Sequence, residues 1–148
     1  MRILGIDPGL AIVGYSVLDY VGNKFNVITY DAIQTKAGVP FPERLEIIFH
    51  CLSDIICKYK PEEMAIEELF FHKNVTTGIS VAHARGVEVL AARLHQIPIY
   101  EYTPLQIKEA VVGYGRAEKK QVQQMVKILL NLQAVPKPDD VADAIAVA

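Results

Sequence analysis

Cysteine is scarce in this chain of 148 residues, which contains only Cys51 and Cys57. The two lie six positions apart in a segment with helical spacing, so their side chains point in different directions and cannot pair with each other. Two such cysteines are typical of a reducing cytoplasm and argue against a disulfide framework. No cysteine and histidine spacing resembles a zinc site either. We therefore expect a cytoplasmic protein.

Long hydrophobic runs are also missing. No apolar stretch reaches the roughly 18 residues that a membrane-spanning helix needs, and the first residues read as a strand rather than as a signal peptide. We therefore expect no membrane partner. Hydrophobic residues still make up 51% of the chain. The length favours one domain over residues 1–148, and the hydrophobic surplus suits either a surface buried against another protein or a well-filled core.

Positive charge is not in excess, because 15 lysines and arginines stand against 17 acidic residues, for a net charge of −2. This balance argues mildly against binding to nucleic acid, which depends on neutralising phosphates. The distribution of charge carries more information than its sum. Basic residues cluster late in the chain, at Lys108, Arg116, Lys119, Lys120 and Lys127.

Apolar spacing predicts an α/β fold. The expected strands are residues 2–7, 12–19, 24–35, 63–67 and 97–102, with a hairpin turn at Gly22-Asn23. The expected helices lie between Pro40 and Pro61, at about 75–95, from Pro104, at about 117–132 and from about Asp139. This order predicts a mixed five-stranded sheet, with three antiparallel strands followed by α/β alternation and with helices on both faces. Because Ala148 lies about two turns into the last helix, we expect a C-terminal tail to be missing or very short.

Four carboxylates stand where they can converge. Asp7 ends the first strand and Glu67 ends the fourth, so the two lie side by side if these strands are parallel neighbours. Asp140 and Asp143 share one face of the last helix. The pairing of Asp139 with Asp143 is equally compatible with helical spacing, and Asp139 could instead be the helix N-cap. Taken singly, Asp7 also suits a simple turn, and Glu67 suits a solvated strand end.

A cluster of these acids favours a bound cation. Two like charges about 4 Å apart repel by roughly 4 kcal/mol at an effective dielectric constant near 20. Oxygen ligands without cysteine or histidine select Mg²⁺ or Mn²⁺. Two such ions could activate water and stabilise the leaving oxygen of a phosphodiester. The pattern therefore predicts a metal-dependent nuclease.

Several motifs, in the right order, resemble those of RuvC, the bacterial Holliday-junction resolvase family, over essentially the whole chain. They are Gly-Ile-Asp-Pro-Gly at 5–9, Ala-Ile-Glu-Glu-Leu-Phe at 65–70, Lys-Asn at 73–74, Ala-Arg-Gly-Val at 84–87, Val-Val-Gly-Tyr-Gly-Arg-Ala-Glu-Lys at 111–119 and Asp-Val-Ala-Asp-Ala at 140–144. The resemblance implies an RNase H-like fold, a homodimer, and two Mg²⁺ ions per subunit that support paired cuts in a four-way DNA junction. It also implies RuvA and RuvB as helicase partners.

The resemblance also implies roles for single residues. The catalytic and metal-binding quartet becomes Asp7, Glu67, Asp140 and Asp143, which favours Asp140 over Asp139. The basic residues near the site become Lys108 and Lys119, and the DNA-contacting aromatic becomes Phe70, ahead of its neighbour Phe71. Together with the other exposed basic candidates, the expected DNA contacts are Phe70, Lys73, Arg85, Lys108, Arg116, Lys119 and Lys120.

The helix at 75–95 has more apolar coverage than one contact face needs, and a two-fold dimer formed through it would supply two sites for two symmetric cuts. Three alternatives remain at this point. One is an RNase H-like nuclease that trims ribosomal RNA precursors, and another is a junction-binding protein without cleavage. The third is an ATPase of the sugar-kinase or actin type, which would need a second such domain.

Overall fold

A mixed sheet of five strands runs through the centre of the protein, for which a computed structural model describes residues 1–69 and 75–148. The strand order is β3-β2-β1-β4-β5. The strands are β1 (Arg2–Asp7), β2 (Ile12–Val21), β3 (Lys24–Gln34), β4 (Glu63–Glu67) and β5 (Ile99–Tyr102). The first three are antiparallel, whereas β4 is parallel to β1 and β5 is parallel to β4. The predicted sheet is confirmed.

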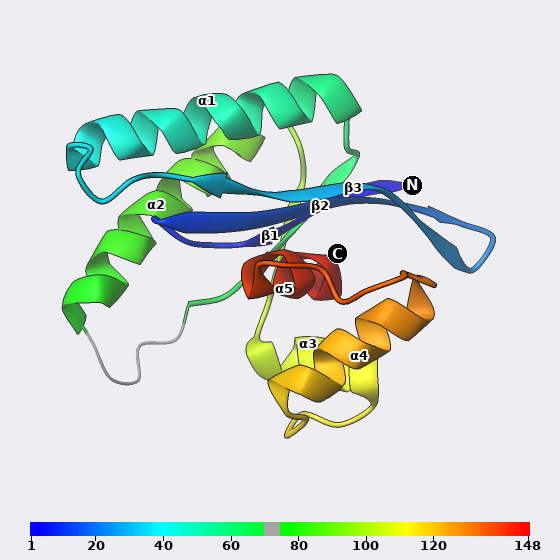
Figure 1. The fold of residues 1–148 in the computed structure, drawn as a ribbon. Coiled ribbons are helices and arrows are strands. Elements are labelled where there is room, and N and C mark those ends of the chain that lie inside the picture. The colour runs from blue at the N-terminus through cyan, green and yellow to red at the C-terminus, as the bar shows by residue number, and fades with distance from the viewer. Residues whose placement is uncertain (70–74) are drawn as a thin grey trace.

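Helices cover both faces of this sheet, as predicted (Figure 1). On one face lie α1 (Phe41–Tyr59) and α2 (Val75–Leu94), and on the other lie α3 (Pro104–Val112), α4 (Lys119–Leu129) and α5 (Asp139–Val147). The second strand ends two residues later than predicted and the third ends one residue earlier, and two other elements start later than predicted. The fifth strand begins at Ile99 because Pro98 has no N–H to donate to a ladder. The fourth helix begins only after Glu118, which is its N-cap.

The face under α1 and α2 holds a large apolar core. Alternate residues of β1 and β4 point into it, including Leu4, Ile6 and Ile66, and none of these three is exposed. Ile48 and Leu52 of α1 pack against them at helical spacing. The burial of these side chains fixes which face of each strand is inside, so the intervening residues, Asp7 and Glu67 among them, belong to the opposite face.

That opposite face is built to admit α5 closely. A Cβ added to Gly5 would overlap the carbonyl oxygen of Ala144, and one added to Gly14 would overlap the carbonyl oxygen of Asp140. Ser16 lies beside Gly5 across the β1–β2 ladder, and its hydroxyl donates a hydrogen bond to Ala144 O at 2.9 Å. These three small residues of the sheet form the seat of α5.

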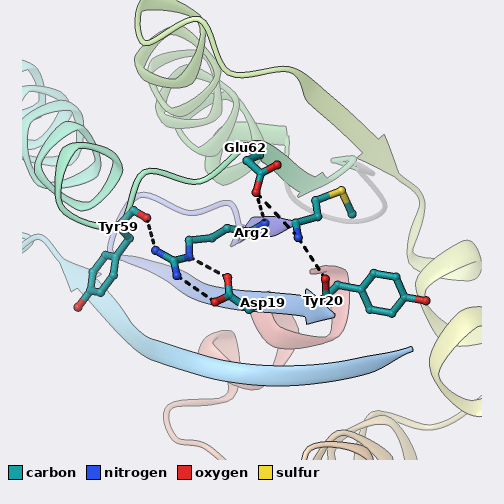
Figure 2. A network of polar contacts seen from close by, with 6 residues as sticks. Arg2, Asp19, Tyr20, Tyr59 and Glu62 are labelled. Atoms are coloured by element: carbon teal, nitrogen blue, oxygen red, sulfur yellow. Dashed lines mark hydrogen bonds and ion pairs between the residues drawn. The ribbon is translucent and has the colours of Figure 1, made fainter. Parts of the chain in front are cut away.

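A polar network fixes the far end of β1, away from Asp7 (Figure 2). The Arg2 guanidinium donates to both carboxylate oxygens of Asp19 on β2, at 2.8 and 2.9 Å, and to the carbonyl oxygen of Tyr59 at the end of α1, at 2.8 Å. The Arg2 backbone N–H donates to Glu62, just before β4, at 2.9 Å. These contacts tie β1 to β2, α1 and the start of β4, and so support the strand register that places Asp7.

Replacement of Gly14 by alanine should push α5 off its seat. We expect Gly14→Ala to lower the free energy of unfolding by about 1–3 kcal/mol, as over-packing usually does, and to displace Asp140 from the sheet edge. Thermal melts of Gly14→Ala test this, with Gly38→Ala as the control because a Cβ at Gly38 meets nothing within 4 Å. Equal melting temperatures for the two variants would contradict a close α5 contact.

Candidate active site

The site begins where two parallel strands end side by side. The parallel ladder aligns Ile6 of β1 with Ile66 of β4, so the next residues, Asp7 and Glu67, stand next to each other at the carboxyl ends of these strands. The side chains of Asp7 and Glu67 lie on the face of the sheet that α5 covers. The predicted juxtaposition of Asp7 and Glu67 is therefore present.

The third and fourth acids come from α5. Asp7 pairs across the β1–β2 ladder with Gly14, the residue on which the backbone of Asp140 rests. This contact places Asp140 at the same sheet edge as Asp7. Asp143 follows almost one turn later and lines a pocket with Glu67, Lys108 and Lys119.

The pKa values show that these acids share one electrostatic environment. Burial, together with the charges of Asp143, Glu67 and Asp140, raises the pKa of Asp7 to about 8, although Lys119 opposes this shift. Burial also raises the pKa of Glu67, with Asp143 adding to the effect. The pKa of Asp143 is raised by burial in the same way, although its hydrogen bond to Lys119 works against this. At neutral pH Asp7 therefore retains a proton that an isolated carboxylate would lose.

Lys119 reaches into this cluster from the first turn of α4. Its Nζ lies 2.8 Å from Asp143 Oδ2 and 3.8 Å from Asp139 Oδ2. Burial lowers the pKa of Lys119, but the hydrogen bond and the charge of Asp143 outweigh it, and the net shift is upward. The start of α4 is fixed by Gln121, which accepts a hydrogen bond from the backbone N–H of Glu118 at 2.7 Å.

The second lysine near the acids is Lys108, which comes from α3. This helix starts at a capping box in which the Thr103 hydroxyl accepts from Gln106 N at 3.1 Å and Gln106 accepts from Thr103 N at 2.9 Å. The positive charge of Lys108 lowers the pKa of Glu67, in opposition to burial. Two lysines from separate helices thus flank the acids.

Asp139 has a different environment from Asp140. Its carboxylate lies 2.7 Å from Lys137 Nζ, and the hydrogen bond from Lys137 lowers the pKa of Asp139. The N-cap of α5 is Pro138, so the alternative of Asp139 as the N-cap is wrong. Asp140, not Asp139, contributes the charge that raises the pKa of Asp7.

The predicted DNA contacts fall into three groups. Arg116 and Lys120 are exposed and lie close to Lys119 along the chain. Arg85 is partly buried and already paired, because its Nε donates to Glu67 O at 3.1 Å and its Nη2 lies 2.6 Å from Glu101 Oε2. Phe70 and Lys73, and also Phe71, lie outside the residues that the structure describes.

The sequence reasoning missed three residues around the site. Gly14 and Ser16 seat α5, and Glu88 of α2 accepts a hydrogen bond from Gly9 N at 3.4 Å, just after Asp7. Two signals were available. Small residues alternate with large ones in the second strand, and a glutamate interrupts the core-facing positions of the helix at 75–94.

The chemistry of the donors fits a divalent metal ion. The four carboxylates offer hard oxygen ligands, the kind that Mg²⁺ and Mn²⁺ prefer, and the pKa values of Asp7, Glu67 and Asp143 are raised. In residues 1–69 and 75–148, however, no three Asp, Glu, His or Cys side chains are gathered tightly enough to hold an ion as they stand. A bound ion would have to draw the carboxylates together and compete with the contact between Lys119 and Asp143.

Comparison with known proteins identifies the family. A family model described as crossover junction endodeoxyribonuclease RuvC matches residues 3–148. Relatives of that name are 64% identical in Alkaliphilus metalliredigens and 57% identical in Brevibacillus brevis, and the matches cover this whole chain and 90% and 89% of those proteins. The chain belongs to the RuvC family. The resemblance expected from its motifs is confirmed.

Solved RuvC structures share the fold. The structure of Thermus thermophilus RuvC matches with a TM-score of 0.93 at 33% identity, covering all of this chain and 91% of that one. The same protein in complex with a Holliday junction substrate matches with a TM-score of 0.91 at 31% identity, covering all of this chain and 90% of that one. The expected RNase H-like fold is confirmed. In the described part of this RuvC chain, no helix has the length and apolar character to cross a membrane.

Removal of the Asp7 charge should stabilise the metal-free fold. The pKa of Asp7 is about 8 in the folded protein and near 4 when unfolded. The folded state therefore binds the proton more tightly, and stability falls as pH rises from about 4 to 8. In EDTA, we expect Asp7→Asn to exceed the wild type by about 2–4 kcal/mol at pH 8 and to match it near pH 4.

Melting curves across this pH range provide the measurement, with the exposed Asp54→Asn as the control for loss of one surface charge. An Asp7→Asn variant that melts below the wild type in EDTA at pH 8 would show that the carboxylate stabilises the metal-free fold instead.

Proposed function

We propose that this protein resolves four-way DNA junctions by hydrolysing a phosphodiester in each of two strands, with Asp7, Glu67, Asp140 and Asp143 holding divalent metal ions. Membership of the crossover junction endodeoxyribonuclease family supports the reaction class. The observation that supports the site is the convergence of the four acids at one sheet edge, where burial and the neighbouring carboxylates raise the pKa of Asp7 to about 8. Mg²⁺ is the proposed ion, two per subunit, with Mn²⁺ as a possible substitute.

Each group of side chains has a distinct task in this proposal. Bound metal ions would activate a water molecule and neutralise charge on the scissile phosphate. The carboxylates of Asp7 and Glu67 are held by paired strands, so their backbone positions are rigid, and α5 adds Asp140 and Asp143. Lys108 and Lys119 flank these acids and are placed to contact phosphate oxygens. In-line attack by water leaves a 5′-phosphate and a 3′-hydroxyl.

DNA binding despite a net charge of −2 follows from where the charges lie. Metal ions offset the four acids, while Arg116, Lys119 and Lys120 form a basic strip at the start of α4. We assign Arg116 and Lys120 to phosphate contacts, together with Lys73 and a base-stacking role for Phe70. Arg85 is better placed as a structural residue, because Glu67 and Glu101 occupy its donors.

The proposed dimer interface is the outer face of α2. Val75, Ile79, Leu90 and Leu94 are 69%, 52%, 50% and 61% exposed, and their spacing puts them on one stripe of the helix. The buried residues Ala84, Ala91 and Ala92 occupy the opposite stripe, against the core. An exposed apolar stripe of this kind marks an interaction surface. A two-fold partner bound there would supply the second site for the second cut.

The wider setting is proposed from the family. RuvA and RuvB, which would drive branch migration, are the proposed helicase partners. The junction substrate is chromosomal DNA, which places the proposed activity in the bacterial cytoplasm.

Cleavage of a synthetic junction tests the function. We expect paired, symmetric nicks in a four-way DNA junction when Mg²⁺ is present, and none in linear duplex or structured RNA. Glu67→Gln should reduce cleavage to background while leaving junction binding intact, because it removes one proposed metal ligand and keeps the shape of the side chain.

The contradicting outcomes are specific. Preferential cutting of the RNA would favour a nuclease of the ribosomal RNA processing type. Junction binding with no cleavage in either Mg²⁺ or Mn²⁺ would favour a binding protein.

A charged residue placed in the exposed apolar stripe of α2 tests whether the dimer forms there. Leu90→Glu should give a monomer at micromolar concentration in sedimentation equilibrium, because a buried unpaired carboxylate opposes association. Ile128→Glu is the control, since Ile128 is 68% exposed on α4, away from α2. A wild-type protein that sediments as a monomer, or a Leu90→Glu variant that stays dimeric, would overturn this interface.

A further inference from the structure

Glu88 is in an unusual position for a glutamate. It lies on the core side of α2, with the buried residues Ala84, Ala91 and Ala92 around it on the same stripe of the helix. It has no exposed surface, and it is the one Asp, Glu, Lys or Arg in the described part of the chain that is fully buried. A carboxyl group is costly to bury unless its hydrogen bonds compensate. Packing alone therefore does not account for Glu88.

The contact that Glu88 makes leads directly to the site. Its Oε1 accepts a hydrogen bond from the backbone N–H of Gly9 at 3.4 Å, and its Oε2 has no partner among the described residues. Gly9 is two residues after Asp7, and the intervening Pro8 has no backbone N–H. The Gly9 N–H is thus the first backbone hydrogen-bond donor after Asp7 along the chain, and Glu88 accepts its hydrogen bond.

The turn at Gly9 has little room to adjust by itself. A Cβ on Gly9 would overlap the carbonyl oxygen of Ile12, so the chain folds tightly back between β1 and β2. Glu88 reaches this turn from α2, the face of the sheet opposite to α5. The turn after Asp7 is therefore fixed from one face while Asp140 approaches from the other.

A second side chain of α2 contacts the neighbouring strand end. Arg85 precedes Glu88 by three residues and lies on the same side of the helix. Its Nε donates to the carbonyl oxygen of Glu67 at 3.1 Å, and its guanidinium pairs with Glu101 on β5. One turn of α2 thus contacts the backbone next to both strand-end carboxylates.

We propose that Glu88 is a positioning residue for Asp7: by accepting the Gly9 amide hydrogen bond, it fixes the direction in which the Asp7 carboxylate points toward Glu67 and α5. The role depends on an acceptor oxygen of the right shape and not on a negative charge, because the Gly9 amide needs only an acceptor and Oε2 has no hydrogen-bond partner within the described residues. This proposal rests on the proposed metal-binding function of Asp7.

The neutral form of Glu88 is consistent with that role. Burial and the charge of Asp7 raise the pKa of Glu88 to about 8, against the opposing effects of the Gly9 hydrogen bond and Arg85. Glutamine has the same shape and keeps the acceptor oxygen, so Glu88→Gln is the conservative variant. Glu88→Leu fills the space without an acceptor.

Three measurements separate positioning from simple stability: Mn²⁺ affinity by calorimetry, the single-turnover rate on a bound DNA junction, and the melting temperature. We expect Glu88→Leu to lose at least about 10-fold in Mn²⁺ affinity, as supporting residues of metal ligands do, and to cut more slowly with unchanged junction affinity. Glu88→Gln should stay within about threefold of the wild type. Ala91→Gly, on the next turn of α2, should melt lower and keep its Mn²⁺ affinity.

Hydrogen exchange provides a measurement that needs neither metal nor cleavage. The Gly9 amide should be protected in the wild type and in Glu88→Gln, and it should exchange faster in Glu88→Leu. If Glu88→Leu fails to fold, the proposal is tested instead by the protection of the Gly9 amide in the wild type and by the Mn²⁺ affinity of Glu88→Gln.

Two results would overturn the proposal. One is wild-type Mn²⁺ affinity in Glu88→Leu, and the other is an unprotected Gly9 amide in the wild type. A wild-type protein that neither binds Mn²⁺ nor cuts junctions would instead show that the proposed function is wrong, so the two failures are distinguishable.

Discussion

The site depends on the close contact between α5 and its seat on the sheet. Gly5, Gly14 and Ser16 let the helix backbone rest on β1 and β2, and the Ser16 hydroxyl donates to Ala144 O at 2.9 Å. Because Gly14 is the ladder partner of Asp7, the same contact sets Asp140 beside Asp7. Packing, and not attraction between the acids, brings the carboxylates together.

This arrangement gathers the proposed metal ligands and lowers the stability of the metal-free protein. Burial and like charges raise the pKa of Asp7 to about 8, which shows that the metal-free protein resists ionising this group. Lys119 offsets part of the repulsion through its 2.8 Å contact with Asp143. The rest of the fold stabilises the strained edge, through the apolar core under α1 and α2 and the Arg2 network at the opposite end of β1. A divalent ion would relieve the repulsion directly.

The sequence predicted the parts of the site that depend on strand order. Asp7 and Glu67 each end a predicted strand, and so they could be placed side by side if those strands were parallel neighbours. Asp139 and Asp140 could not be separated by spacing, because the rotation of α5 is set by its tertiary contact with Gly14. Arg85 was assigned to DNA from its charge alone, while its partners Glu67 and Glu101 come from other elements. Glu88 was overlooked within an apolar helix for the same reason.

Proton release on metal binding tests the central claim most directly. If the four acids form one metal site in which burial and mutual repulsion keep Asp7 protonated, Mn²⁺ binding must displace that proton. Calorimetric titration at pH 7 in buffers of different ionisation enthalpy should give about one proton released per subunit, falling toward zero above about pH 9. Metal binding without proton release at pH 7, or no metal binding at all, would contradict the account.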